Sequence, residues 1–179
     1  IFSDGAGATV HEWVEEDQKR GILATAVLAH AQEDVFYLYM DRTFKPGMNS
    51  DKRYIKMKGR KIYEYALKYV PEAMMECLNK AGVSDIRDVK KIFIHQANEK
   101  MDEAIIKRLY KLYGVSEYDP MVAPMNIHDL GNSSVATIPT LLDMVYRKQI
   151  PGHELYPGDL LLFASVGAGM NINAIAYRY

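Results

Sequence analysis

The chain has 179 residues, of which 49% are hydrophobic and 25% are charged, and its formal net charge is −1. This composition is typical of a globular protein with a core, and the charge argues against a nucleic-acid binder or a polybasic membrane protein, because both need a strong positive field. No apolar stretch approaches the ~20 residues that span a bilayer. The single cysteine, Cys77, excludes an intrachain disulfide and favours a reducing compartment. We therefore expect a cytoplasmic protein.

The first forty residues predict strands. Residues 5–15 and 21–30 read as two strands joined by a charged turn, and residues 35–40, rich in aromatic and β-branched side chains, read as a third. Residues 41–57 contain proline, glycine and many charges, which is typical of a surface loop. The chain opens on a glycine turn with no preceding element, so we expect it to be part of something longer.

Helices and strands alternate after this loop. Apolar residues recur at three- and four-residue steps between residues 57 and 81, which predicts a helix that ends at Gly82 and kinks or breaks at Pro71. An alternation of this kind implies a layered α/β fold with a hairpin at the sheet edge. The further predicted elements are strand 91–95, helix 98–113, strand 121–127, helix 133–148, and strands 160–166 and 170–178.

Two polar turns carry the functional signal. His95 ends the predicted strand 91–95 and begins the sequence His-Gln-Ala-Asn, and Asn132 lies in Gly-Asn-Ser-Ser after the next strand. A neutral histidine and an asparagine can both donate hydrogen bonds to one carbonyl oxygen, and so stabilise an enolate or oxyanion. Taken singly, His95 could satisfy a helix N-terminus, and Asn98 and Asn132 could be cap or turn residues. The joint pattern favours catalysis.

Four motifs in order carry a resemblance: Asp4-Gly5-Ala6-Gly7-Ala8, His95-Gln96-Ala97-Asn98, Gly131-Asn132-Ser133-Ser134 and Gly167-Ala168-Gly169. Their order resembles the later half of β-ketoacyl-acyl-carrier-protein synthase III, a condensing enzyme of the thiolase superfamily. The resemblance implies an α/β thiolase-like fold, here the C-terminal half of a five-layer αβαβα sandwich with a mixed sheet. Residues 1–40 would be closing strands of the N-terminal half, 41–57 a surface loop, and 58–179 the C-terminal half of βαβαβαββ type.

The resemblance also implies a reaction. His95 and Asn132 would be two members of a Cys-His-Asn triad whose cysteine lies upstream of Ile1, since Cys77 sits in an apolar helical stripe, where a thiol behaves as a small hydrophobe. The cysteine would accept an acyl group from acyl-coenzyme A, and the enolate of a decarboxylated malonyl thioester would attack it. The expected substrates are acyl-coenzyme A and malonyl-acyl-carrier protein, with no cofactor and no metal.

The binding residues follow from the same resemblance. Residues that would bind substrate or coenzyme A are Gly59, Arg60, Tyr63, Asn98, Gly167 and Gly169. Residues that would dock the acidic carrier protein are Lys100, Lys107 and Arg108. The alternative for these three is an ordinary solvated helix face, with basic side chains placed well near a helix C-terminus.

Departures from the family keep other functions open. Leu130 stands where the family often has a histidine, and Ala168 interrupts the closing glycine run. The chain could instead belong to another thiolase-fold acyltransferase, such as a specialised polyketide, alkylquinolone or hydroxymethylglutaryl-coenzyme A synthase-like enzyme. A third alternative is a non-catalytic subunit that binds carrier protein or dimerises. The expected partners are acyl carrier protein, coenzyme A thioesters, the missing N-terminal half and a second copy in a homodimer, with no nucleic acid and no membrane.

Overall fold

The computed structural model describes residues 2–48 and 51–179. None of the helices in these ranges is both long and apolar enough to cross a bilayer. The strands are β1 (Gly21–Ala29), β2 (Leu38–Asp41), β3 (Tyr54–Met57), β4 (Val89–Ile94), β5 (Leu160–Gly167) and β6 (Asn171–Arg178). The α-helices are α1 (Gly59–Lys80), α2 (Glu99–Leu112), α3 (Ile127–Leu130) and α4 (Thr137–Tyr146).

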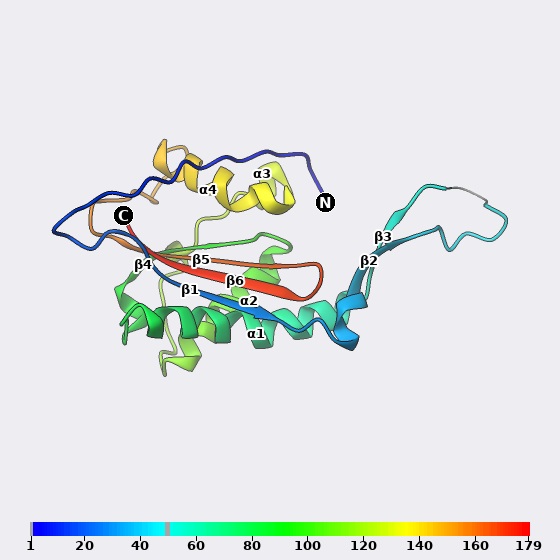
Figure 1. Cartoon of the computed structure of the whole chain (residues 1–179), viewed down its shortest axis with the longest axis horizontal. Helices are drawn as coiled ribbons and strands as arrows, with labels where there is room; N and C mark the ends of the chain where they lie inside the picture. The colour runs from blue at the N-terminus through cyan, green and yellow to red at the C-terminus, as the bar shows by residue number, and fades with distance from the viewer. Residues whose placement is uncertain (1, 49–50) are drawn as a thin grey trace.

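A mixed four-stranded sheet in the order β1-β6-β5-β4 forms the centre of the molecule. The pair β4–β5 is parallel, whereas β6 is antiparallel to both of its neighbours. Helices α1 and α2 cover one face, and α3 and α4 lie on the other (Figure 1). The run Ile92-Phe93-Ile94 is at most 2% exposed because β4 is covered on both faces. The α/β class and the mixed sheet predicted from the sequence are confirmed.

The predicted domain boundary is not reflected in the sheet. Residues 1–40 were expected to belong to a first half and residues 58–179 to a second. Strand β1 instead pairs with β6 along its length, from Gly21 opposite Arg178 to Ala29 opposite Asn171. Residues 21–29 and the strands after residue 58 therefore share one sheet and one core.

Two predicted strands are wrong. Residues 3–20 contain no strand and run as an extended segment across α4, drawn in blue in Figure 1. The prediction of strand 121–127 also fails, because a 3-10 turn, η3 (Pro120–Val122), is followed by irregular chain up to α3. This segment contacts β4 without adding a ladder to it. Proline at residues 120 and 124 removes two of the backbone donors that a ladder needs.

Helix α1 continues through Pro71, so the predicted break does not occur. Proline removes one donor inside the helix, which is normally costly. The helix persists because its inner face is fully buried, with Ala66, Val70 and Met74 all 0% exposed. Packing against the sheet therefore outweighs the local preference of one residue.

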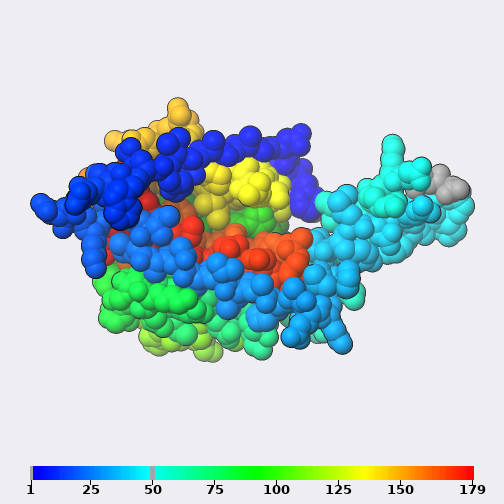
Figure 2. All heavy atoms as spheres, in the orientation of Figure 1, coloured from blue at the N-terminus to red at the C-terminus, as the bar shows by residue number. Residues whose placement is uncertain are grey.

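Strands β2 and β3 form a hairpin that projects from the body (Figure 2). Its strands fall at the borders of the predicted loop 41–57. Of the predicted strand 35–40, residues 38–40 lie in β2, whereas residues 35–37 belong to a 3-10 helix, η1 (Glu33–Tyr37). Exposed apolar side chains include Met40, Phe44 and Ile55. An isolated hairpin is only marginally stable in water. This hairpin is held at its base by a hydrogen bond from the Lys58 N–H to the Tyr37 carbonyl at 2.8 Å.

Candidate active site

His95 directly follows β4, at the end of the sheet where parallel β4 and β5 both terminate. Its backbone N–H donates to the Ala164 carbonyl at 2.9 Å and so continues the ladder. The ring is partly buried, and this burial lowers the pKa of His95, while the nearby Ser134 backbone acts in the opposite direction. His95 is therefore a neutral donor at pH 7.

Asn132 also lies beside Ser134. Gly131 places it with φ 66° and ψ −163°, a conformation essentially restricted to glycine. The Asn132 side chain is 6% exposed, and its Oδ1 accepts the Ser134 N–H at 2.8 Å. The Nδ2 group is thus the end of the amide that donates. Ser134 itself has φ 56°, which is rare for a residue with a side chain.

Gln96 fastens the two turns together, and sequence reasoning missed this role. Its side chain is fully buried, with Nε2 donating to the Pro124 carbonyl at 3.1 Å and Oε1 accepting from the Asn126 N–H at 3.0 Å. Asn126 immediately precedes α3, which leads to Gly131. Because one side chain bridges the chain after β4 and the chain before α3, it fixes where His95 and Asn132 lie relative to each other.

The segment from Ser3 to Gly7 supports the Asn132 turn from outside. The Ser3 N–H donates to the Asn132 carbonyl at 3.0 Å, and the Ser3 hydroxyl donates to the Leu130 carbonyl. A Cβ on Gly5 would lie 2.9 Å from the Ser133 Cβ, and one on Gly7 would lie 2.3 Å from the Pro139 Cγ. Glycine is therefore required because this segment lies directly on the start of α4.

Asn98 caps α2. Its Oδ1 accepts the Met101 N–H at 3.3 Å, which is the structural alternative weighed for it; its role in substrate binding stays a prediction. Lys100, Lys107 and Arg108 are exposed along the same helix.

Three of the residues predicted to bind coenzyme A lie at the end of the molecule that contains the β5–β6 turn. Gly59, Arg60 and Tyr63 form the first turn of α1, whose N-terminal end lies near the β5–β6 turn (Figure 1). Arg60 pairs with Glu64 at 2.9 Å in solvent. Among the residues that the structure describes, no hydrogen bond or ion pair joins these three to His95. Gly167 ends β5, and Gly169 has φ 77° in the turn that follows.

Cys77 has none of the features of a nucleophile. It is 0% exposed, and its Sγ donates to the Ala24 carbonyl at 3.4 Å. Burial raises the pKa of the thiol, which keeps it protonated. The prediction that Cys77 is a core residue is confirmed in its placement.

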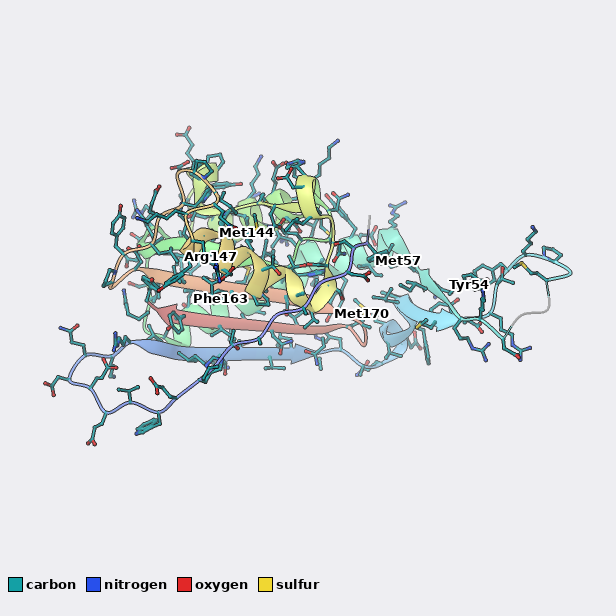
Figure 3. All side chains as sticks on the ribbon, turned by 90° about the horizontal axis from the view of Figure 1, so that it is seen from above. Tyr54, Met57, Met144, Arg147, Phe163 and Met170 are labelled. Carbon is teal, nitrogen blue, oxygen red and sulfur yellow. The ribbon has the colours of Figure 1, made fainter. Side chains whose placement is uncertain are left out.

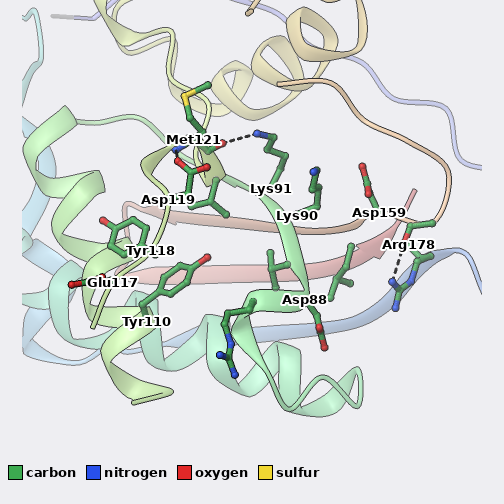
Figure 4. Close-up of a pocket in the computed structure, with 15 residues that line it drawn as sticks. Asp88, Lys90, Lys91, Tyr110, Glu117, Tyr118, Asp119, Met121, Asp159 and Arg178 are labelled. Atoms are coloured by element: carbon green, nitrogen blue, oxygen red, sulfur yellow. Dashed lines mark hydrogen bonds between the residues drawn. The ribbon is translucent and has the colours of Figure 1, made fainter. Parts of the chain in front are cut away.

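Two hollows lie away from these residues. One, of about 500 Å³, is at the opposite end of β4, where the Lys91 ammonium donates to the Met121 carbonyl at 2.6 Å (Figure 4). The other, of about 550 Å³, lies between α4 and the open part of the sheet. Neither is lined by His95 or Asn132. Within residues 2–48 and 51–179 no group of three His, Cys, Asp or Glu side chains could hold a metal ion.

The comparisons with known proteins agree with this geometry. The family model described as "3-Oxoacyl-[acyl-carrier-protein (ACP)] synthase III C terminal" matches residues 78–179. The chain belongs to this family. The predicted resemblance is therefore confirmed, and the fold is that of the C-terminal half of the thiolase fold.

Relatives and solved structures extend the match beyond the family model. The β-ketoacyl-[acyl-carrier-protein] synthase III of Desulfotalea psychrophila is 33% identical over all of this chain and 52% of its own length. The enzyme of the same name from Bartonella henselae is 31% identical, again over all of this chain and 52% of its own length. The crystal structure of the Aquifex aeolicus synthase III aligns with a TM-score of 0.72 at 29% identity, covering 92% of this chain and 46% of that one. The chain thus spans about half the length of the curated relatives it matches.

Proposed function

We propose that this chain is the C-terminal part of a β-ketoacyl-acyl-carrier-protein synthase III-like acyltransferase of fatty acid or related biosynthesis. The observation that carries the proposal is that His95 and Asn132 both lie beside Ser134: Asn132 Oδ1 accepts the Ser134 N–H at 2.8 Å, and the Ser134 backbone acts on the pKa of His95. A neutral imidazole and the Asn132 amide each carry an N–H group, and two such donors that reach one oxygen suit a developing oxyanion.

The mechanism assigns the enolate oxygen to these donors. The bond between the malonyl carboxylate carbon and C2 breaks, carbon dioxide leaves, and the electron pair forms an enolate. The thioester oxygen accepts the His95 N–H, and Asn132 Nδ2 supplies a second hydrogen bond. The enolate carbon then attacks an acyl-cysteine thioester, a carbon–carbon bond forms, and the thiolate leaves. Because His95 is neutral, it donates a hydrogen bond without transferring its proton.

We infer that the nucleophilic cysteine is supplied outside these 179 residues. Support comes from Cys77, which is buried and held protonated. On this proposal the 179-residue chain alone transfers no acyl group. Acyl-coenzyme A and malonyl-acyl-carrier protein are the proposed substrates, with no further cofactor. A homodimer completed by an N-terminal half is the proposed assembly. The proposed location is the cytoplasm, for which the single reduced cysteine is the support.

The experiment separates acylation from decarboxylation in the full-length protein. His95→Ala is expected to lower malonyl decarboxylation by ~10²–10³-fold, because one oxyanion donor is removed. Acylation of the nucleophile, followed by mass spectrometry after incubation with acyl-coenzyme A, is expected to remain. Asn132→Ala is expected to behave in the same way.

A matched histidine provides the control. His128 is exposed and bonds Glu99 at 2.9 Å, so His128→Ala is expected to keep both activities. Full decarboxylase activity in His95→Ala, or an acyl group found on Cys77, would contradict the assignment.

A further inference from the structure

A buried hydrogen-bond network lies behind the β5–β6 turn. The Met170 carbonyl accepts two donors, the Tyr65 hydroxyl at 2.8 Å and the backbone N–H of His30 at 3.2 Å. The Tyr65 oxygen also lies 2.6 Å from His30 Nδ1. Tyr65 is 4% exposed and Met170 is 1% exposed. Three elements, the end of β1, the start of α1 and the β5–β6 turn, therefore meet at one carbonyl group.

The single hydroxyl proton fixes the direction of the network. Since the Tyr65 O–H donates to the Met170 carbonyl, its oxygen is left to accept from His30. His30 must then carry a hydrogen on Nδ1. Burial raises the pKa of Tyr65 to about 12, so the hydroxyl keeps its proton over the working range of an enzyme. The side chain of Tyr69 packs on both rings, with centroids 4.5 Å from His30 and 4.7 Å from Tyr65.

The carbonyl that the network holds belongs to a strained residue. Met170 has φ 52° and follows Gly169 at φ 77°, so two successive residues are left-handed. A side chain disfavours that region, and such a conformation persists only where its surroundings fix it. Figure 3 shows Met170 at the tip of the sheet. The turn it closes begins at Gly167, at the same sheet end as His95.

We propose that Tyr65 and His30 are positioning residues that hold the Gly167–Gly169 turn in shape for the reacting thioester. Tyr65 and His30 do not touch the substrate. They act through the Met170 carbonyl, which anchors the turn from its buried side. The role deepens the proposed condensation and rests on it.

The first experiment removes one oxygen atom in the full-length enzyme. Tyr65→Phe keeps the ring packing and deletes the donor to Met170. A small displacement of a site can cost up to ~10²-fold in rate, so we expect kcat for condensation to fall ~10-fold or more while KM for acyl-coenzyme A changes less than ~2-fold. Tyr69→Phe is the matched control, because the Tyr69 hydroxyl accepts from the exposed Lys68 at 3.0 Å and takes no part in the Met170 network, and it is expected to keep wild-type kcat.

A second pair of variants tests the other half of the network and does not depend on Tyr65→Phe folding. His30→Ala leaves the Tyr65 oxygen without its donor, and we expect a loss of kcat similar to that of Tyr65→Phe. His30→Asn places an amide N–H close to the position of Nδ1, and we expect it to restore most of kcat. A purely structural role would not be rescued in this way. Wild-type kcat in both Tyr65→Phe and His30→Ala would overturn the proposal.

Hydrogen exchange distinguishes failure of this inference from failure of the proposed function. Amides in peptides covering residues 167–171 are expected to exchange faster in Tyr65→Phe than in wild type, while those of β4 are unchanged. If the wild-type enzyme shows no condensation, the proposed function fails and the exchange result alone decides whether the network holds the turn. If the exchange rates of amides at residues 167–171 are the same in Tyr65→Phe and wild type, the inference is contradicted even where condensation is observed.

Discussion

Asp102 is the most unusual single residue in the chain. It is 0% exposed on α2, and neither carboxylate oxygen has a partner among the residues that the structure describes. Burial raises the pKa of Asp102 to about 8, while the nearby Asn98 backbone, which makes no hydrogen bond to the carboxylate, acts in the opposite direction. A position flanked by buried Met101 and Ile105 would ordinarily hold an apolar residue, which is the sequence signal that could have revealed it.

This carboxyl group makes stability depend on pH. The folded state holds its proton up to about pH 8, whereas the unfolded chain loses it near about 4. The folded state binds more protons between these values, so the free energy of unfolding falls as pH rises through that window. Asp102→Asn removes this dependence. We expect the free energy of unfolding of Asp102→Asn, compared with that of wild type, to rise by at least about 1 kcal/mol between pH 4 and pH 8.

Thermal and denaturant unfolding at a series of pH values would measure the effect. Glu103→Gln is the control. Glu103 is exposed at the next position of the same helix, and its substitution also replaces a carboxyl group by an amide. A parallel pH profile for wild type and Asp102→Asn would show that the carboxyl group is not buried in the folded protein.

At the scale of elements, the local pattern of apolar residues was enough to predict an element where one of its faces is buried. Helices α1 and α2 and strands β4, β5 and β6 lie within a few residues of their predicted ranges. Strands 5–15 and 121–127 failed because strand formation depends on a partner elsewhere in the chain, and no partner is offered to them. Gly5 and Gly7 pack on the start of α4 instead, and no sequence periodicity predicts such glycine contacts.

In the candidate site too, some features could be predicted from local sequence and others could not. His95 and Asn132 were predicted because each stands in a turn with a recognisable motif, and the structure brings both to Ser134. The strand expected before Asn132 is absent, and α3 leads into its turn. Gln96 was missed because its two partners, at residues 124 and 126, are distant in sequence and offer only backbone groups.

Helix α2 allows a test of carrier-protein docking. Lys107 and Arg108 are exposed, and they lie on the helix that starts beside His95. On the proposed function they attract an acidic carrier protein, so Lys107→Glu with Arg108→Glu should raise KM for malonyl-acyl-carrier protein about 10-fold or more through repulsion. KM for acyl-coenzyme A is expected to change little. Steady-state kinetics with each substrate varied in turn would measure both.

Lys90→Glu is the control for this charge reversal. Lys90 is an exposed lysine near the start of β4, at the end of the strand away from His95. Its reversal changes the net charge in the same direction without altering the α2 surface. An equal rise in KM for Lys90→Glu would mean that overall charge matters and α2 does not dock the carrier protein. The effect should also shrink as salt is added.

At the scale of the whole molecule, one face of the sheet is only partly covered. Helix α4 lies over part of it, and the hollow beside α4 is lined by Ile22, Phe163, Ile175 and Tyr177. On β1 the same face is open, with Ile22 51% exposed and Val27 61% exposed. Apolar area of this kind, concentrated on one face, marks a surface that another protein surface covers.

We therefore expect the 179-residue chain, expressed by itself, to self-associate through this face. Sedimentation velocity over a range of protein concentrations would show a rising average mass. Val27→Glu places a charge in the open face and is expected to weaken association. Leu112→Glu is the matched control, since Leu112 is 39% exposed on α2 at the opposite side of the sheet, and it should leave association unchanged. A monomer at every concentration would show that this face does not drive association, and dissociation by Leu112→Glu instead of Val27→Glu would show that another surface of the chain makes the contact.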